Sequence, residues 1–427
     1  MKVSVSKVSV STTMRTAALH GVAVTRADTN GLLDVGLAPD SGAESIVARA
    51  DKVAAVAVAF AGAVDSESRF PAEAIAAART KGLLGIAVPR ELGGGGASLD
   101  EVADICYRLG RACGSSALIY AMHQTKVACI VRHGRASVWH QRLLRRLCAE
   151  QMLLASSTTE GDRGGDIRNS AAAIERRAQR VTLRRDATVI SYGEEADGLV
   201  TTARRSAEAA SADQVLLVLV KDDYTLERQS GWDALGMRGT CSAGFRLVAS
   251  AAAEQVLPVP YEEIHTRTMM PVAHLLWSAA WAGIAAAAVE RARIFVRKAM
   301  QRADGALPPG AAHVTRANVS LQALRSLVSD GLHHFTSIAD DAVALEAIDF
   351  QAGMNLLKVN ASELAVATVM SAMQACGLAG YRNDSEFSIG RHLRDILSSP
   401  VMISNDRVLA NVGMASLLTG ISSSLRD

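Results

Sequence analysis

The chain has 427 residues, of which 49% are hydrophobic and 21% are charged. This balance suits a globular protein with a large buried core and excludes a disordered or fibrous one. Its 45 Lys and Arg residues nearly cancel its 43 Asp and Glu residues, so we expect no basic surface that binds nucleic acid or an anionic membrane. The length predicts two or three domains.

The six cysteines are scattered, without a CxxC pair or a nearby cluster of histidines. Neither a metal site nor a disulfide framework is therefore expected, and we interpret the cysteines as small buried side chains in a reducing cytoplasm. Residues 1–40 lack the apolar run of a signal peptide and are interpreted as a disordered lead-in. The most apolar stretch, Ala279–Val289, is too short to span a bilayer and predicts a buried helix.

Residues 41–153 are predicted to form an α-helical domain, because alanine-rich segments place apolar residues at helical spacing. The run Gly93–Gly96 interrupts the helices and predicts a loop. This loop lacks the lysine and the serine or threonine of a phosphate-binding P-loop. Helix is expected again after Ser98, an N-cap followed by acidic residues. Three histidines in this domain are interpreted as structural: His123, His133 and His140.

Residues 154–265 are predicted to form a middle β domain of the barrel or sandwich type, and residues 266–427 a C-terminal four-helix bundle. The predicted strands are Ala173–Arg185, Thr188–Tyr192, Gly198–Ala203, Gln214–Val220 and Phe245–Ser250. Helices longer than the globular average must pack on one another: Val272–Gln301, Val314–Ala339, Leu345–Gly377 and Val401–Leu418. The predicted fold class is α+β.

The stretch Ser156–Asp166 joins the helical half to the strand-rich middle. It contains four hydroxyl side chains and three glycines. Hydroxyls both donate and accept hydrogen bonds, and glycines let the main chain approach a bound molecule closely. Two interpretations are open at this point: a solvated turn, or a loop that binds the polar edge of a cofactor.

Several segments, in the same order along the chain, resemble motifs of the acyl-CoA dehydrogenase superfamily of FAD-dependent flavoproteins. The resemblance runs from about residue 43 to the C-terminus. The matching segments are Leu83–Gly94 for G-x-x-x-P-x-E-x-G-G, Thr159–Asp166 for T-E-P-G-x-G-S-D, Gly236–Ser242 for G-x-R-G-[ST]-x-[ST], Gln374–Tyr381 for Q-x-x-G-G-x-G, and Arg394-Asp395 for the R-D pair.

The resemblance implies that FAD is held between the β domain and the C-terminal bundle of a homo-oligomer, either a dimer or a tetramer. Thr158 and Thr159 would then bond the edge of the flavin ring, and Ser191 would lie near the flavin N5 atom. Gln374 and Gly377 would contact the adenosine-pyrophosphate part of a neighbouring subunit's FAD.

The resemblance also implies α,β-dehydrogenation of an acyl thioester on CoA or a carrier protein, with hydride transfer to flavin N5 and a protein that accepts the electrons. A glutamate of the family takes the α-proton. Here Ile403 and Ala273 occupy the two positions that branches of the family use, so the chain resembles a divergent member. Asp406 is the nearest carboxylate, but it also fits a capped surface turn.

Two alternatives stay open beside dehydrogenation. A flavin-dependent monooxygenase of the same fold works with a flavin reductase and O₂ and needs no α-proton base. Such relatives often carry a C-terminal histidine, for which His392 is the candidate. The other alternative is a non-catalytic flavin-binding homologue.

Overall fold

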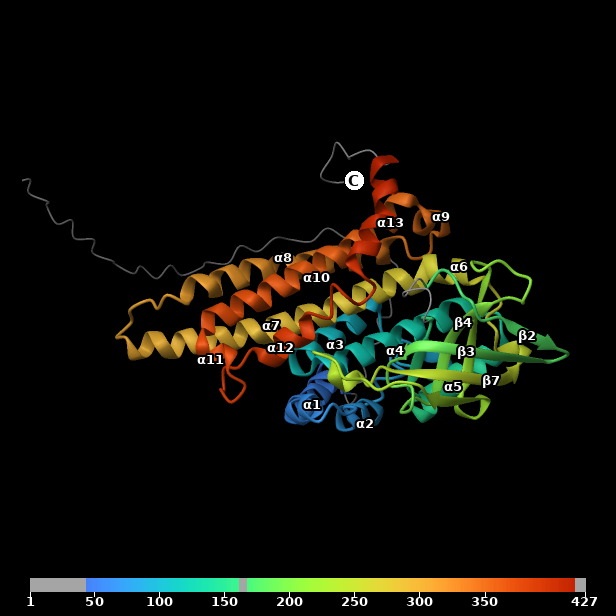
Figure 1. Ribbon diagram of the computed structural model, residues 1–427, viewed down its shortest axis with the longest axis horizontal. Coiled ribbons are helices and arrows are strands. Elements are labelled where there is room, and N and C mark those ends of the chain that lie inside the picture. The colour runs from blue at the N-terminus through green and yellow to red at the C-terminus, as the bar shows by residue number, and fades with distance from the viewer. Residues whose placement is uncertain (1–43, 161–166, 419–427) are drawn as a thin grey trace, which may run out of the picture. The chain divides into compact units, whose positions relative to one another are not determined.

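The computed structural model describes residues 44–160 and 167–418 (Figure 1). The chain separates into two units, and the described residues belong to the second unit, Glu44–Asp427. The predicted lead-in 1–40 lies outside the described residues, as does Gly161–Asp166 of the hydroxyl-rich stretch. In the second unit helices come first, strands second and long helices last, which confirms the predicted α+β class.

Alanine-rich segments form the helices that precede the strands: α1 (Ile46–Ser66), α2 (Ala72–Thr80), α3 (Leu99–Ala112), α4 (Gly114–His133) and α5 (Val138–Glu150). Helix α3 begins at the predicted N-cap. The Ser98 hydroxyl accepts the amide N–H of Glu101 at 3.2 Å, and the Glu101 carboxylate accepts the amide N–H of Ser98 at 2.8 Å. This capping box satisfies donors that the start of the helix would otherwise leave free.

The described strands form two sheets, in the orders β1-β4-β5 and β2-β3-β7-β6. Strand β1 pairs in parallel with β4, and the other pairs are antiparallel. Strands β1 and β6 were not predicted, because their four and five residues carry too short a pattern. The strands are β1 (Leu154–Ser157), β2 (Ile174–Arg177), β3 (Arg180–Ile190), β4 (Gly198–Arg204), β5 (Gln214–Val220), β6 (Tyr224–Arg228) and β7 (Ala243–Ala252).

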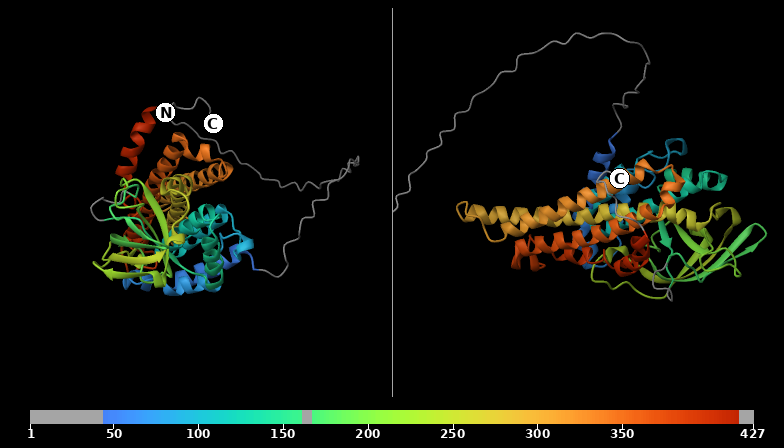
Figure 2. Two further views of the ribbon diagram at one scale, coloured as in Figure 1. Left: turned by 90° about the vertical axis from the view of Figure 1, so that its right-hand side faces the viewer. Right: turned by 90° about the horizontal axis from the view of Figure 1, so that it is seen from above.

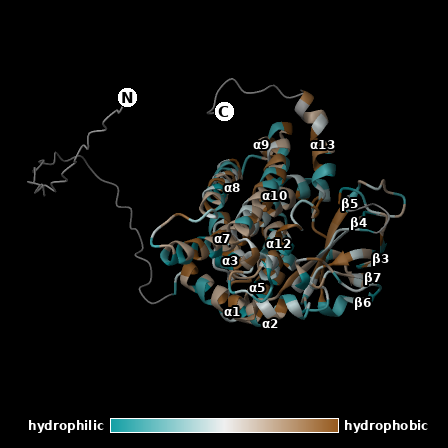
Figure 3. Cartoon of the chain, turned by 60° about the vertical axis from the view of Figure 1, so that its left-hand side comes forward, coloured by the Kyte–Doolittle hydropathy of each residue, from teal (hydrophilic) through white to brown (hydrophobic). Residues whose placement is uncertain are grey.

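Strand β5 is buried on both faces, and its sequence is accordingly apolar at every position after the first (Figure 3). Leu216 and Val218 belong to one hydrophobic cluster, which includes Leu147 of helix α5. Leu217 and Leu219 belong to the main core. The alternation of side chains along a strand therefore places this sheet between helix α5 and the main core.

A bulge interrupts the pairing of β3 with β7 between Ala187 and Ile190. Along β3 exposed and buried residues alternate as far as Ala187, but Ile190 is buried where strict alternation would expose it. A bulge adds one residue to a strand and turns the following side chains to the other face. It thereby sets the direction of the side chains at the end of this strand.

The predicted C-terminal helices are present with nearly the predicted bounds: α7 (Met270–Arg302), α8 (Ala311–Ser337), α10 (Ile348–Cys376) and α13 (Asn405–Leu418). Helix α7 contacts α8 and α10 and also α3 and α4 of the N-terminal part, so it is the central helix (Figures 1 and 2). Helix α13 packs against α10. Shorter helices complete this part: α6 (Tyr261–Ile264), α9 (Ala342–Glu346), α11 (Leu378–Tyr381) and α12 (Gly390–Ile396).

In the part of the chain that the structure describes, two helical segments are long and apolar enough to cross a membrane by length and composition alone: Tyr261–Arg302 and Ile348–Cys376. In the first, 89% of the most apolar window is buried inside the protein. The predicted buried helix Ala279–Val289 lies within α7 and is buried almost throughout. Core helices pass the same test, so the finding is weak evidence for a membrane span.

Helices α3 and α7 approach each other backbone to backbone, because glycines meet where they cross. A Cβ atom at Gly283 would overlap the Tyr107 carbonyl oxygen, and one at Gly110 would overlap the Ala280 carbonyl oxygen. The central helix can therefore pack this closely on the N-terminal part only with glycine at these positions.

We predict that Gly283→Ala lowers the thermal unfolding midpoint, because overpacking of a dense contact costs about 1–3 kcal/mol. The matched control is Gly62→Ala in helix α1, where an added Cβ meets no atom within 4 Å. In the control, alanine should stabilise the helix by about 0.5–1 kcal/mol. A Gly283→Ala protein as stable as the wild type would contradict the proposed close contact.

Candidate active site

A cavity of about 1000 Å³ lies where the three parts of the described chain meet. Helix α4, the ends of β1 and β3, the start of α7, and the helices α10 and α13 all contribute side chains to its wall. Three residues predicted to bind the flavin ring line this cavity: Thr158, Thr159 and Ser191. Ile403 and Ala273, the two positions without the expected glutamate, line it as well.

Thr158 and Thr159 follow strand β1 and line the cavity. Thr158 Oγ1 lies 3.5 Å from Ser156 Oγ, and Thr159 Oγ1 donates to the Val189 carbonyl oxygen over 3.5 Å. Both contacts are at the long limit for hydrogen bonds between oxygen atoms. These hydroxyls are therefore available for stronger bonds to a polar molecule in the cavity.

Ser191 ends a chain of hydroxyl groups at the bulged end of β3. Thr240 Oγ1 donates to the Met237 carbonyl oxygen at 2.9 Å and lies 2.8 Å from Ser242 Oγ, which lies 2.8 Å from Ser191 Oγ. Each hydroxyl has one proton, so Ser242 donates to Thr240 and Ser191 donates to Ser242. The Ser191 oxygen keeps its lone pairs, which can accept an N–H from a molecule in the cavity.

Glu160 follows the two threonines and binds the segment Ser170–Ala172. Its carboxylate accepts the Ser170 hydroxyl at 2.9 Å and the Ala172 amide at 3.1 Å, and it also accepts the Ala171 amide. The buried guanidinium of Arg185 lies 3.3 Å from the same carboxylate. Glu160 thus binds the segment Ser170–Ala172 and compensates the buried charge of Arg185, which explains the glutamate in the Thr159-Glu160 pair.

The Arg394-Asp395 pair joins the C-terminal part to the segment that carries the hydroxyl chain. Asp395 is buried and accepts the Met237 amide N–H at 2.7 Å. Burial raises the pKa of Asp395 to about 6. Arg394 forms an ion pair with Asp65 at the end of α1, and Arg238 donates to the Asp65 carbonyl oxygen at 2.9 Å. Two motifs predicted separately, Gly236–Ser242 and Arg394-Asp395, therefore meet each other and the end of α1 at one junction.

His123 links Leu84, in the segment before the glycine-rich loop, to strand β1 and is structural, as predicted. Its Nδ1 accepts the Leu154 amide N–H at 3.0 Å, so its Nε2 carries the proton and donates to the Leu84 carbonyl oxygen at 2.8 Å. Burial lowers the pKa of His123 to about 4, which keeps this tautomer neutral. The segment that precedes the glycine-rich loop is thereby joined to the β domain.

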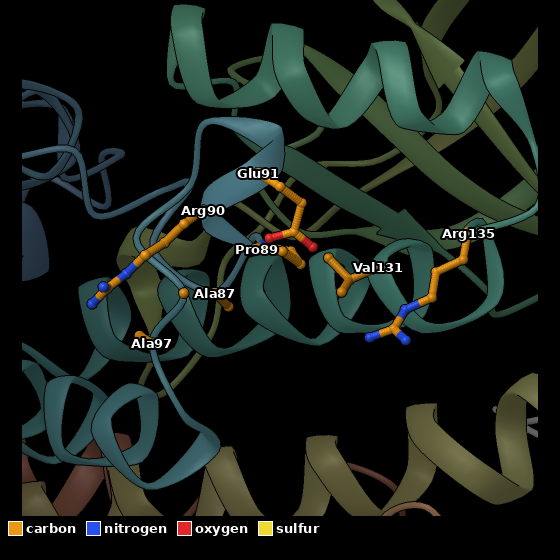
Figure 4. A pocket seen from close by; sticks show the side chains of 8 residues that line it. Ala87, Pro89, Arg90, Glu91, Ala97, Val131 and Arg135 are labelled. Carbon is orange, nitrogen blue, oxygen red and sulfur yellow. The ribbon is translucent and has the colours of Figure 1, made fainter. Parts of the chain in front are cut away.

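A smaller hollow of about 450 Å³ lies over the same loop. Figure 4 shows Glu91 between Arg90 and Arg135, with Pro89 and Val131 below it. The three charged side chains are exposed, so the hollow is open to water. It is less than half the volume of the larger cavity, and its charged side chains are exposed.

The position expected for a catalytic glutamate has a particular backbone conformation. Ile403 has φ +51°, a left-handed conformation that is strained for a β-branched residue. Its carbonyl oxygen accepts the buried Lys358 ammonium at 2.7 Å, and Lys358 also donates to Asn405 Oδ1 at 2.7 Å. Lys358 therefore holds this loop in place beside the cavity.

Four other predicted site residues do not line the large cavity. Asp406 is exposed in the first turn of α13, as expected of a surface turn, and His392 is buried in α12 beside Arg391. Gln374 and Gly377 are exposed at the end of α10. Their predicted contact with a neighbouring subunit's FAD stays a prediction.

The sequence patterns did not indicate the polar side chains that lie in the mostly apolar walls of the cavity. Lys126 and His274 line the cavity and are at least 94% buried. Among the described residues, Trp277 Nε1 and Gln214 Oε1 also line it and are buried without a hydrogen-bond partner. A ring with donors and acceptors along its edge, such as a flavin, fits such a lining. Single polar residues on apolar helices gave no periodic signal that could have identified them.

We predict that Glu160→Gln lowers the unfolding midpoint and loosens flavin binding. Removing one partner of a buried ion pair leaves the Arg185 charge uncompensated, which costs about 3–5 kcal/mol. In the double variant with Arg185→Met no such charge remains, so part of the stability should return. Thermal unfolding and the flavin content of both proteins check this, and equal losses in the two would contradict the pairing.

Solved structures show the same fold. An FMN-bound TdsC from Paenibacillus sp. A11-2 superposes with a TM-score of 0.77 at 17% identity, covering 88% of this chain and 98% of that one. A KijD3 in complex with dTDP superposes with a TM-score of 0.76 at 21% identity, covering 88% and 96%. At these identities the likeness concerns the fold alone.

The curated relatives and family models agree with this fold. The cyclohex-1-ene-1-carbonyl-CoA dehydrogenase of Geobacter metallireducens is 29% identical over 181 residues, which are 42% of this chain and 47% of that relative. The match thus spans about half the length of the relative. Family models match residues 42–151 (acyl-CoA dehydrogenase, N-terminal domain) and residues 266–417 (acyl-CoA dehydrogenase, C-terminal domain). The chain therefore belongs to the acyl-CoA dehydrogenase family of flavin-dependent oxidoreductases.

Proposed function

We propose that the protein is an FAD-dependent oxidoreductase that dehydrogenates an acyl thioester carried by CoA or by a carrier protein. The family and its dehydrogenase relative support this proposal. The observation that carries it is a proton acceptor in the cavity, His274, which stands in for the missing glutamate.

Thr158, Thr159 and Ser191 would hold the edge of the flavin ring, since their oxygens face the cavity with weak or incomplete protein partners. The adenosine half of FAD would extend toward Gln374 and Gly377 of a second copy in a homo-oligomer. Both residues are exposed, and an added side chain at Gly377 meets no atom within 4 Å. This end of α10 is therefore accessible to a second molecule.

The ring nitrogens of His274 have different roles. Nδ1 lies 3.1 Å from the Met354 carbonyl oxygen, and a carbonyl only accepts, so Nδ1 carries the proton. Burial lowers the pKa of His274 to about 3, so the ring is neutral at ordinary pH. Nε2 then has a lone pair, and among the described residues His274 makes no second hydrogen bond.

In the proposed reaction Nε2 of His274 takes the proton from the carbon next to the thioester carbonyl. The bound flavin supplies the two-electron acceptor for the hydrogen that leaves the β-carbon. The apolar side chains of Ile403 and Ala273 help to exclude water. A neutral imidazole in a dry cavity can act as a general base, because its protonated form is then stabilised by the charge that develops on the substrate.

A flavin-dependent monooxygenase is the second candidate, and one observation favours it. In the described part of the cavity wall the carboxylates are Glu262 and Glu346, and both are exposed. Neither is a buried base of the kind that the family uses. A reaction of reduced flavin with O₂ needs no base for an α-proton.

Anaerobic titration with a panel of acyl-CoAs tests the proposal. We predict that an acyl-CoA bleaches the flavin absorption of the wild type. His274→Gln should keep its flavin but bleach about 10²–10⁴ times more slowly, which is the usual contribution of a general base. The control is His392→Gln, since His392 is buried but does not line the cavity.

Two results would contradict the proposal. One is a protein that no acyl-CoA bleaches but that takes up O₂ with a flavin reductase, which would favour the monooxygenase. The other is a His274→Gln variant with wild-type rates. In the His274→Gln background, Ile403→Glu should restore part of the rate, because it returns a carboxylate to the family's position.

A further inference from the structure

Lys126 is a buried cation without a charged partner. It lies on helix α4, is 6% exposed and lines the cavity. Its ammonium contacts the thioether sulfur of Met269 at 3.5 Å. Within residues 44–160 and 167–418, no carboxylate forms an ion pair with it.

Two other buried cations, Arg185 and Lys358, have oxygen atoms of the protein as partners. Arg185 pairs with Glu160, and Lys358 donates to the Ile403 carbonyl oxygen and to Asn405. An isolated buried ammonium costs several kcal/mol, and an anion at hydrogen-bond distance offsets that cost. Burial lowers the pKa of Lys126, as expected where no anion is present. The arrangement therefore suits an ammonium whose anionic hydrogen-bond acceptor comes from a bound ligand.

The residues of α4 that line the cavity indicate the shape of that ligand. Leu118, Met122 and Lys126 are spaced four residues apart, so they lie along one face of the helix, and all three line the cavity. A short acyl chain would lie along Met122 and end at the ammonium, with Leu118 farther along the same face. From Met122 to Lys126 the helix rises about 6 Å, which a chain of a few carbon atoms spans.

We infer that Lys126 binds a carboxylate at the far end of the substrate's acyl group, so that the substrate class is an ω-carboxyacyl thioester. This inference rests on the proposed function for the thioester end and on Lys126 alone for the carboxylate end. Charge-assisted hydrogen bonds from a buried ammonium give the selectivity, while the apolar face of α4 gives the contact area.

Paired probes of equal length test the inference on the purified flavoprotein. Succinyl-CoA and butyryl-CoA differ by a carboxylate in place of a methyl group. We expect succinyl-CoA to bind about 10–100 times more tightly, as a charge-assisted bond gives about 1.5–3 kcal/mol. In Lys126→Met this preference should vanish, because the variant keeps the length and the apolar contacts but removes the charge. Lys126→Arg should keep it in part.

A second pair, hexanoate and 1-hexanol, tests the ammonium without a thioester. Hexanoate should raise the unfolding midpoint of the wild type more than 1-hexanol does, and equally small shifts are expected in Lys126→Met. If neither CoA ester binds but the hexanoate preference is present, the thioester proposal fails while the carboxylate site stands. A preference that persists in Lys126→Met, or is missing from the wild type, overturns the inference.

The flavin content of the variant shows whether the anion at Lys126 comes from the flavin or from the substrate. If Lys126 contacts a phosphate of the flavin, Lys126→Met will lose its flavin, and the assignment to the substrate is overturned. Full flavin content in the variant, together with the lost preference for succinyl-CoA, supports the substrate assignment.

Discussion

The buried carboxylate of Asp395 connects the C-terminal helices to the wall of the cavity. It accepts the Met237 amide N–H at 2.7 Å from a position on α12, and the adjacent Arg394 pairs with Asp65 at the end of α1. The hydroxyl chain to Ser191 starts at the Met237 carbonyl oxygen. The geometry of the flavin-facing wall therefore depends on contacts that arrive from both helical parts, and the cavity exists only where all three parts meet.

The long elements could be predicted from the sequence because their patterns extend over many residues. Helices α7 and α10 have 33 and 29 residues, so each is a long segment of helix-favouring composition. Strands β1 and β6 are short and depend on pairing with distant strands, which no local pattern records. The bulge after Ala187 is equally invisible, since the register is set by β7.

Part of the candidate site could be predicted from the sequence. There is a physical reason why some of its residues were predicted and others were not. Thr158, Thr159 and Ser191 lie in segments whose resemblance to family motifs placed them at the flavin, and all three line the cavity. His274 and Lys126 lie on helices that are apolar around them. A single polar residue in such a helix is recognised only when the fold shows which face borders a cavity and which bonds its atoms already make.

The protein keeps the family's motif residues at the predicted flavin site. At the position of the family's catalytic glutamate, however, it has an apolar residue. The loop at Ile403 keeps its place beside the cavity through Lys358, although its side chain cannot take a proton. Two buried titratable groups that line the cavity, His274 and Lys126, come from helices α7 and α4. Both belong to the apolar walls and not to the loop that carries the family's glutamate.

A crystal structure of the protein with its flavin would show whether this cavity holds the flavin ring. We expect the ring inside the cavity, with its polar edge at hydrogen-bond distance from Thr158, Thr159 and Ser191 and with its N5 side facing the wall that contains Ile403 and His274. A flavin bound elsewhere on the chain, or a well-folded protein that binds no flavin at all, would contradict this expectation.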